Sequence, residues 1–327
     1  FLIPNTLGLE AQSRVGCAVR SVDELKALLA RPEYLNSQSV VLGSGSNVIA
    51  MPIVEKLIIK MCIKGVHRVK ENKDFVWIKV GAGESWDLLV RTLLKKNVFG
   101  LENLALIPGL VGAAPIQNIG AYGREVSEFV EEIQVFDKSG EERTLKAPDC
   151  GFGYRTSIFK SNNDFIVGSV TFKLLKRPEP KIEYPDLKNL LNSLNLIAPS
   201  PQDIADAVTQ IRTEKLPNPV THPNAGSFFK NPLVEVELAQ KLICQIEGLK
   251  VFEATGGFKL SAAQLIDLDG WKNKPGKNVC CWSKQPLVLV NRGAATASDI
   301  LSYAKNIGIG IKERFGITLE REPLVLS

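Results

Sequence analysis

A cluster of small residues has the composition of a backbone anion site. Gly43, Ser44, Gly45, Ser46 and Asn47 follow an apolar run, so several backbone N–H groups can converge on an anion without obstruction by side chains. The segment lacks the G-x-G-x-x-G spacing before a long helix, and so does not match the dinucleotide fingerprint of a doubly wound fold. The residues leave two interpretations, a phosphate-binding turn and a tight turn with only a structural role.

A second, longer segment is better suited to hold a large ligand. Residues 107–123 contain four glycines and no charged residue, a composition that suits neither a regular helix nor a strand. Such a segment can place bare backbone against a flat or phosphorylated ligand. The alternative is a loop packed inside the protein, whose backbone polar groups would need other partners. The candidate cofactor-binding residues are Pro108, Gly109, Gly112, Ala113, Ala114, Gln117, Asn118, Ile119, Gly120, Tyr122 and Gly123.

Composition argues against several other kinds of site. The chain has only two histidines, His67 and His222, which leaves little material for a histidine-built zinc site or a Ser-His-Asp triad. The six cysteines lie far apart except for Cys280 and Cys281, and their surroundings lack metal-ligand spacing. We therefore expect buried free thiols and no metal.

Length and charge narrow the class of protein. With 327 residues the chain suggests two or three lobes. No apolar run approaches the roughly 20 residues of a membrane span, and the net charge of +5 is mild and without a basic stretch. We expect neither a membrane nor a nucleic-acid partner. The chain opens at Phe1 with no secretion signal, and we expect a cytoplasmic protein.

Hydrophobic patterning predicts mixed α and β structure in the first half. Ser21 and Glu24 have capping-box spacing and open a helix near 22–31. A second helix is expected at about 85–96. Strands are expected where β-branched and aromatic residues dominate, at 39–42, 48–49, 56–62, 74–80, 131–136 and 165–175.

A change of composition at residues 177–180 marks the expected domain boundary. The sequence Arg-Pro-Glu-Pro at these positions is proline-rich and charged, as linkers are. Glycines 308 and 310 weaken the last helix of the second half, so the pattern does not fix its end. Beyond the boundary we expect helices near 202–213, 235–246 and 297–313 and a strand at 286–290.

The motifs of both halves resemble those of the UDP-N-acetylenolpyruvoylglucosamine reductases, the FAD- and NADPH-dependent enzymes of peptidoglycan precursor synthesis. The resemblance covers essentially the whole chain. Its motifs are Asn5-Thr6-Leu7-Gly8, Leu42 to Asn47, Gly81-Ala82-Gly83-Glu84, Pro108 to Gly123, Phe152 to Lys160, Lys215-Leu216-Pro217, Asn224 to Pro232 and Leu319 to Glu322.

The resemblance implies an α+β protein with a two-subdomain FAD-binding fold of the vanillyl-alcohol-oxidase (PCMH) type and a C-terminal α+β substrate-binding domain. The expected FAD-binding domain is 1–177, with subdomains of about 1–64 and 65–177. The expected substrate-binding domain is 178–327, and its last strand returns Glu322 to the active site.

The implied reaction reduces the enolpyruvyl ether of UDP-N-acetylglucosamine to a lactyl ether. The co-substrate NADPH gives a hydride to FAD, and the reduced flavin passes it to the vinyl carbon. The neighbouring carbon becomes enolate-like, so the protein must stabilise the substrate carboxylate and then protonate that carbon. NADPH and the sugar nucleotide would use the same flavin face in turn.

Three residues match the catalytic positions of the family. Arg155 would bind the substrate carboxylate, because a guanidinium presents paired donors and stays charged. Glu322 would share a proton with that carboxylate, which requires a raised pKa. Glu320 is its rival, since both would point to one face of a strand. Ser227 would donate the proton to the carbon. Without the motifs, Arg155 is an ordinary surface arginine and Ser227 a cap on local backbone.

Tyr184, Lys215 and Asn231 match positions that contact the sugar nucleotide. Lys215 can pair with the diphosphate. The segment around Tyr184 is similar to the family branch that places a tyrosine over the substrate from an extra loop. As isolated residues all three would be ordinary surface positions. Arg212 is a further candidate for a phosphate contact, but we do not assign it to the site.

Three features depart from the family pattern. Ala113-Ala114 replaces a pair in which serine is common, Gln264 stands where a tryptophan is usual, and the chain stops at Ser327, short of the usual tail. We expect these changes to affect fine geometry and stability more than the reaction.

Two other functions remain open. An FAD-dependent oxidase or dehydrogenase of an alcohol would share the FAD-binding fold, but would have no reason to combine Arg155, Ser227 and Glu322. A non-catalytic FAD or UDP-sugar binding protein would need neither Ser227 nor Glu322. In every case we expect a small-molecule ligand and a monomer or weak oligomer.

Overall fold

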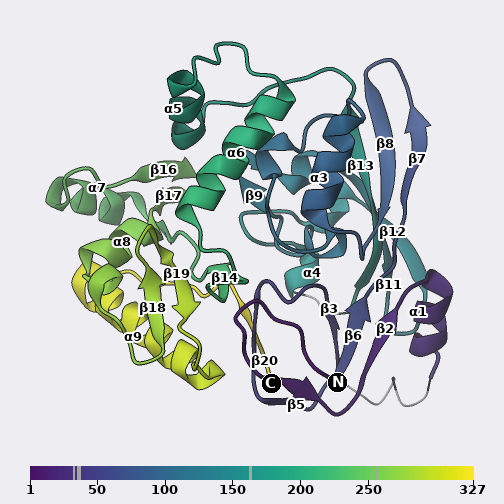
Figure 1. Cartoon of the computed structure of the whole chain (residues 1–327), viewed down its shortest axis with the longest axis horizontal. Helices are drawn as coiled ribbons and strands as arrows, with labels where there is room; N and C mark the ends of the chain where they lie inside the picture. The colour runs from purple at the N-terminus through teal and green to yellow at the C-terminus, as the bar shows by residue number, and fades with distance from the viewer. Residues whose placement is uncertain (32–33, 35–37, 162–163, 255) are drawn as a thin grey trace. The chain divides into compact units, whose positions relative to one another are not determined.

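The computed structural model describes residues 1–31, 34, 38–161, 164–254 and 256–327. It contains two compact units, each assembled from segments that are distant in the sequence (Figure 1). The first unit comprises Phe1, residues 13–44 and residues 55–212, and the second comprises residues 2–12, 45–54 and 213–327.

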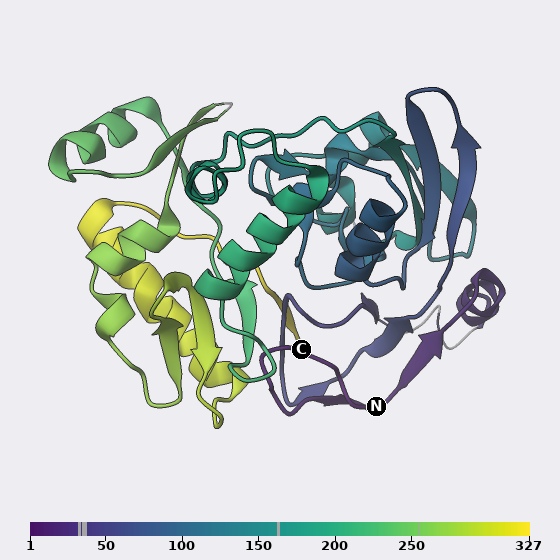
Figure 2. The same ribbon diagram turned by 45° about the horizontal axis from the view of Figure 1, so that its top comes forward.

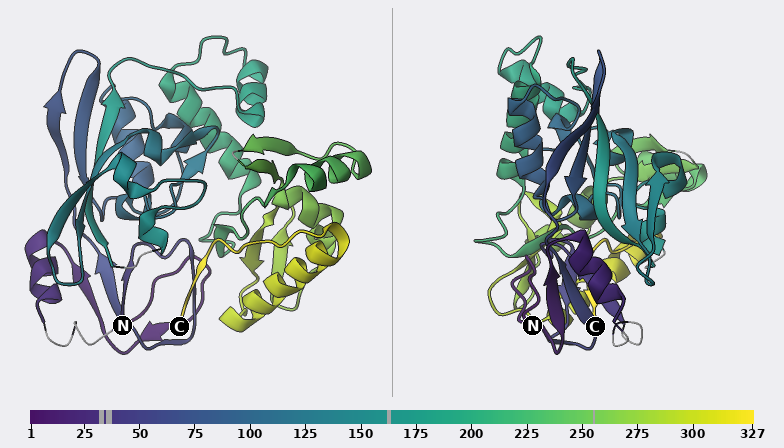
Figure 3. Two further views of the ribbon diagram at one scale, coloured as in Figure 1. Left: turned by 180° about the vertical axis from the view of Figure 1, so that it is seen from behind. Right: turned by 90° about the vertical axis from the view of Figure 1, so that its right-hand side faces the viewer.

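A five-stranded antiparallel sheet is the centre of the first unit. Its middle strand is buried along most of its length, as its apolar sequence predicts. Helix α3 (Trp86–Lys95) packs on one face of the sheet and buries Trp86, Leu89 and Leu93 (Figure 3). The strand order is β12 (Glu142–Lys146), β11 (Val130–Phe136), β13 (Ile166–Leu175), β8 (Phe75–Gly81) and β7 (Val66–Glu71).

The first unit also contains a smaller parallel sheet. Its order is β2 (Gly16–Val19), β6 (Leu57–Met61) and β3 (Ser39–Leu42). Helix α1 (Val22–Leu29) begins at the predicted cap, because the Ser21 hydroxyl accepts a 3.0 Å hydrogen bond from the Glu24 amide. The Glu24 carboxylate in turn accepts from the Arg20 amide at 2.7 Å, which fixes the start of the helix.

The predicted boundary at residue 177 differs from the division in the structure. Residues 177–180 are exposed, as a linker is, but the first unit continues to Arg212. The division falls inside helix α6 (Pro201–Lys215). The physical reason is burial: α6 and α5 (Pro185–Ser193) contribute apolar side chains to the first core, among them Leu187, Leu191, Ile204, Val208 and Ile211.

The second unit has two small antiparallel sheets. One has the order β14 (Asn224–Ser227), β19 (Gln285–Asn291) and β18 (Val279–Trp282). The other has the order β15 (Leu233–Val234), β17 (Gly257–Leu260) and β16 (Val251–Ala254). Figure 2 shows the long helix α9 (Ala297–Phe315) alongside β18 and β19. The unit also contains α7 (Val236–Gln245), α8 (Ala262–Leu268) and the parallel pair β4 (Val48–Ala50) and β20 (Leu324–Leu326).

Short strands, one short helix and several 3-10 turns make up the rest of the described structure. None of the helices in the described part of the chain has the length and hydrophobicity needed to cross a membrane. The remaining elements are β1 (Gln12–Ser13), β5 (Ile53–Val54), β9 (Gly120–Ala121), β10 (Arg124–Glu125), α4 (Ile158–Ser161) and the 3-10 turns η1 (Glu102–Leu104), η2 (Val111–Ala113), η3 (Val126–Glu128), η4 (Ala147–Cys150) and η5 (Trp271–Asn273).

Helix α9 runs through both of its glycines, which separates their roles. We expect Gly308→Ala to stabilise the protein by about 0.5–1 kcal/mol, because alanine loses less conformational entropy in a helix and a Cβ at this position has no neighbour within 4 Å. Gly310→Ala is the matched control and should destabilise, since its Cβ would lie 2.3 Å from Asp269 Oδ2. Urea unfolding followed by circular dichroism measures both. A loss of stability in Gly308→Ala would contradict this account.

Candidate active site

The long glycine-rich loop lies directly against the strand-to-helix connection that precedes α3. The amide of Gly112 donates to the Ala82 carbonyl at 2.9 Å, and that of Val111 to the Glu84 carbonyl at 2.9 Å. A Cβ on Gly112 would lie 2.5 Å from the Ala82 Cβ, so only glycine permits this approach. Ala113, at the end of η2, is exposed, so the loop reaches the surface of the first unit at this residue.

The side chain of Asn118 holds the far end of this loop in place. It is 1% exposed. Its Nδ2 donates to Glu125 Oε2 at 2.8 Å and to the Gly153 carbonyl at 3.2 Å, and its Oδ1 accepts from the Ser127 amide at 3.0 Å. Both N–H groups of the side chain are thus used within the chain. The amide of Asn118 therefore helps to shape the loop.

Arg155 is brought against the loop by these contacts. Its guanidinium donates to the Gly120 carbonyl at 3.0 Å and lies 5.4 Å from the Tyr154 ring centroid. A Cβ on Gly120 would approach Arg155 Nη1 to 3.3 Å, so glycine at this position leaves room for the guanidinium. Two motifs that the sequence predicts separately therefore meet in the first unit.

An aromatic and cationic cluster surrounds Tyr122, in the same unit. Its ring meets the Tyr184 ring edge-on, with centroids 5.2 Å apart. Burial raises the pKa of Tyr122 to about 12, even though the positive charge of Arg212 acts to lower it. The phenol is therefore neutral at physiological pH and can donate a hydrogen bond.

Arg212 is the residue of this cluster that sequence reasoning left unassigned. Among the described residues, its Nε is a buried donor with no hydrogen-bond partner. Burial lowers the pKa of Arg212, although Tyr122 and Asp87 oppose this, and the positive charge of Arg155 lowers it further. Two guanidinium groups that repel one another, one with an unsatisfied donor, favour a bound anion.

The second unit places the segment that contains Glu322 alongside the residues that follow Ser227. Residues 320–322 run antiparallel to residues 228–230: the Glu322 amide donates to the Phe228 carbonyl at 2.9 Å, and the Lys230 amide to the Glu320 carbonyl at 2.9 Å. The Glu320 side chain is 67% exposed and forms an ion pair with Lys230, whereas Glu322 is half-buried. Of the two rival acids, Glu322 is the more shielded from solvent.

The turn that follows β3, residues 43–47, contributes residues to both units. In the second unit, a Cβ on Gly45 would lie 1.9 Å from the Pro4 carbonyl oxygen, and the Thr6 amide donates to the Gly45 carbonyl at 3.2 Å. Among the described residues, the Thr6 hydroxyl is buried and has no hydrogen-bond partner. A glycine turn beside an orphaned hydroxyl fits a ligand oxygen. In the first unit, a Cβ on Gly43 would lie 3.3 Å from the Leu110 side chain. Ser44 is exposed.

The two other predicted substrate residues also lie in the second unit. Lys215 is the last residue of α6 and is half-buried. Asn231 Oδ1 accepts from the Ala262 amide at 3.0 Å, at the start of α8. This bond orients the amide and leaves its nitrogen as the group that can donate to a ligand.

Gln264, a departure from the family pattern, has a structural role. Its Oε1 accepts from the Lys250 amide at 2.7 Å, and its Nε2 donates to the Gly248 carbonyl at 2.9 Å. The amide thereby ties the chain after α7 to α8, so the change is compensated locally.

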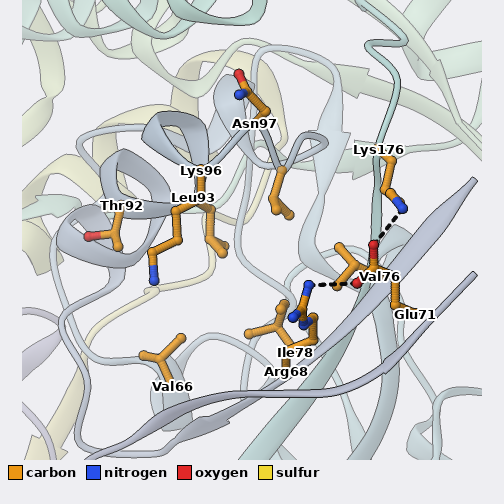
Figure 4. Close-up of a pocket in the computed structure, with 11 residues that line it drawn as sticks. Val66, Arg68, Glu71, Val76, Ile78, Thr92, Leu93, Lys96, Asn97 and Lys176 are labelled. Atoms are coloured by element: carbon orange, nitrogen blue, oxygen red, sulfur yellow. Dashed lines mark hydrogen bonds and ion pairs between the residues drawn. The ribbon is translucent and has the colours of Figure 1, made fainter.

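A cavity of about 410 Å³ lies between α3 and the β7–β8 hairpin, away from all of these residues (Figure 4). Val76 and Ile78 belong to its apolar lining. Arg68 and Lys176 both point to Glu71, the former at 2.6 Å. Two of the cations in its lining are thus paired with a carboxylate, and Lys96 also lines the cavity.

Comparison with known proteins gives matches along the whole chain. A family model described as UDP-N-acetylenolpyruvoylglucosamine reductase, C-terminal domain, matches residues 218–326, and one described as FAD binding domain matches residues 14–146. The UDP-N-acetylenolpyruvoylglucosamine reductase of Ralstonia nicotianae is 40% identical, over 98% of this chain and 96% of the relative. That of Bdellovibrio bacteriovorus is 39% identical over the same shares, 98% and 96%.

A solved structure agrees with these relatives. The crystal structure of UDP-N-acetylenolpyruvylglucosamine reductase from Thermus caldophilus superposes with a TM-score of 0.68 at 25% identity, covering 99% of this chain and 96% of that one. The predicted α+β fold, the FAD-binding domain and the oxidoreductase class are confirmed. The chain belongs to the UDP-N-acetylenolpyruvoylglucosamine reductase family.

Proposed function

We propose that the protein reduces the enolpyruvyl ether of UDP-N-acetylglucosamine to UDP-N-acetylmuramate, with NADPH as hydride donor, in cytoplasmic peptidoglycan precursor synthesis. Family membership gives the reaction class. The observation that carries the proposal for this chain is the pairing of residues 320–322 with residues 228–230, because it sets Glu322 beside the strand that ends at Ser227.

Bound FAD supplies the hydride chemistry, and the chain supplies position and electrostatics. The residues that would hold it are the turn 43–47 and the loop 108–123. The orphaned Thr6 hydroxyl supports this fit, since it offers an unused hydrogen bond. The close approach at Gly112 fixes the loop against Ala82.

Arg155, Glu322 and Ser227 divide the acid–base work. Arg155 binds the substrate carboxylate through paired donors and stabilises the charge that develops on it. Glu322, in its protonated form, donates a hydrogen bond to the same carboxylate. Ser227 gives its hydroxyl proton to the enolate carbon and regains one from solvent.

Four further residues would hold the diphosphate and sugar of the substrate. Tyr184 and Lys215 contribute a phenol and a cation, and Asn231 contributes its amide nitrogen. We add Arg212, whose unsatisfied Nε is the polar group in the Tyr122 cluster that most needs an acceptor.

Purified protein tests the reaction directly. We expect a yellow protein whose flavin absorbance is bleached by NADPH without oxygen and restored by the enolpyruvyl sugar nucleotide. An alcohol oxidase or dehydrogenase would instead be reduced by an alcohol. A non-catalytic binding protein would hold flavin or UDP-sugar without either change. Absence of flavin, or no reoxidation by the sugar nucleotide, rejects the proposal.

Ser227→Ala separates the two half-reactions. Flavin reduction by NADPH should proceed at the parental rate, while reoxidation by the sugar nucleotide should slow by about 10²-fold or more, because the proton donor is lost. Stopped-flow absorbance measures each step. Ser193→Ala, an exposed serine whose hydroxyl donates to the Leu190 carbonyl, is the control and should leave both rates unchanged. Equal loss of both steps would remove Ser227 from the acid role.

Arg212→Gln tests the added cation. We expect KM for the sugar nucleotide to rise about tenfold or more, as a charge-assisted hydrogen bond is worth roughly 1.5–3 kcal/mol. The dependence of KM on ionic strength should also weaken. Arg143→Gln, which removes an exposed guanidinium paired with Asp137 and Glu141, is the matched control. An unchanged KM would leave Arg212 as a support for Tyr122 only.

A further inference from the structure

Asn103 joins two segments of the first unit that lie far apart in sequence. It is fully buried, at 0% exposure. Its Nδ2 donates one hydrogen bond to the Tyr122 carbonyl at 2.9 Å and another to the Lys181 carbonyl at 2.8 Å. Both donors of the amide are thus used, one on the end of the glycine-rich loop and one on the segment that leads to Tyr184.

The amide is presented from a fixed support. Asn103 lies in η1, and the Leu104 carbonyl of this turn accepts from Trp86 Nε1 at 2.9 Å. Glu102 closes the turn from the other side, because its Oε2 accepts from the Gly100 amide at 2.7 Å. Trp86 itself is 1% exposed and belongs to the core under the sheet. The position of the amide is therefore set by the core and not by the two segments it holds.

Only one orientation of the amide serves both acceptors. If the side chain were reversed, its oxygen would face two carbonyl oxygens, and neither would receive a proton. In the observed orientation Oδ1 is buried without a hydrogen-bond partner among the described residues. The chain thus leaves one acceptor unsatisfied in order to donate twice, which indicates that the two donations are what this residue supplies.

Two further contacts join the same segments. Arg124 Nη2 donates to the Glu179 carbonyl at 3.0 Å, and the Tyr122 and Tyr184 rings meet at 5.2 Å. Arg124 is half-buried and also binds Glu128 at 2.8 Å. Residues 179–184 have no helix or strand of their own, so these contacts and Asn103 define where the segment runs.

We propose that Asn103 is a positioning residue that places Tyr184 for the substrate by tying residues 179–184 to the loop at Tyr122. The catalytic consequence rests on the proposed function, whereas the tie itself does not. Asn103 touches neither cofactor nor substrate in this scheme. It makes the loop that would hold FAD and the tyrosine that would cover the substrate parts of one assembly.

Limited proteolysis with trypsin tests whether Asn103 holds the two segments together, and it does not require catalytic turnover. In Asn103→Ala we expect cleavage of the FAD-loaded protein after Lys181 to be about tenfold faster or more, since the carbonyl of that peptide bond loses its anchor and the segment detaches. Asn103→Asp, of the same shape but without the two donors, should behave alike and covers the case in which the alanine variant does not fold. Asn291→Ala removes another buried amide, which donates to the Leu7 carbonyl at 2.9 Å in the second unit, and should not change this cleavage. If the Asn103 variants are cleaved at the parental rate, Asn103 does not anchor residues 179–184.

A double-mutant cycle with Tyr184→Ala tests positioning. Asn103→Ala should raise KM for the sugar nucleotide about tenfold and leave kcat within about twofold, but have almost no further effect when Tyr184 is already alanine. A merely structural role would lower activity equally in both backgrounds, and that result overturns the proposal. If no variant and no parental protein turns over the sugar nucleotide, the proposed function has failed, and the cleavage rates alone decide whether Asn103 ties the segments.

Discussion

The candidate residues of the first unit depend on one buried amide, that of Asn118. It donates to Glu125 and Gly153 and accepts from the Ser127 amide. Backbone hydrogen bonds hold the first part of the loop at Val111 and Gly112, and this side chain holds its far end. An amide suits this position because it can donate twice and accept at once. By fixing Gly153 it also fixes the chain just before Arg155.

Sequence patterns predicted the elements whose burial is strongly periodic or continuous. Helix α3 and strand β13 lie within two residues of their expected ends, because an apolar stripe or run is a local property of the chain. Strand β7 was missed: all of its residues are exposed, so no buried face gives it a pattern, and only its pairing with β8 makes it a strand. The expected boundary at 177 also differs from the division into compact units, since a linker-like composition does not reveal which core the following helices join.

The glycine segments of the site could be predicted because the need for glycine is local. At Gly112 and Gly45 a side chain would collide with neighbouring atoms, and such close approaches appear in sequence as runs of small residues. The partners that complete the site are not visible in this way. Thr6 and Asn103 matter through contacts with residues far away in sequence, and Arg212 is one of 40 lysines and arginines. Their roles follow from burial and unsatisfied hydrogen bonds, which only the fold creates.

Backbone strain at the site gives a further reason to assign it a function. Among the described residues, Asn118, Tyr122 and Arg155 have φ values of 47, 48 and 53°, where glycine would fit without cost. A side chain in this region costs of order 1 kcal/mol or more. At Asn118 the three hydrogen bonds of the side chain offset this cost within the fold. At Arg155 the guanidinium donates to the Gly120 carbonyl and lies 5.4 Å from the Tyr154 ring centroid. The strained backbone at Arg155 therefore stands directly beside the glycine-rich loop, where such strain is typical of functional sites.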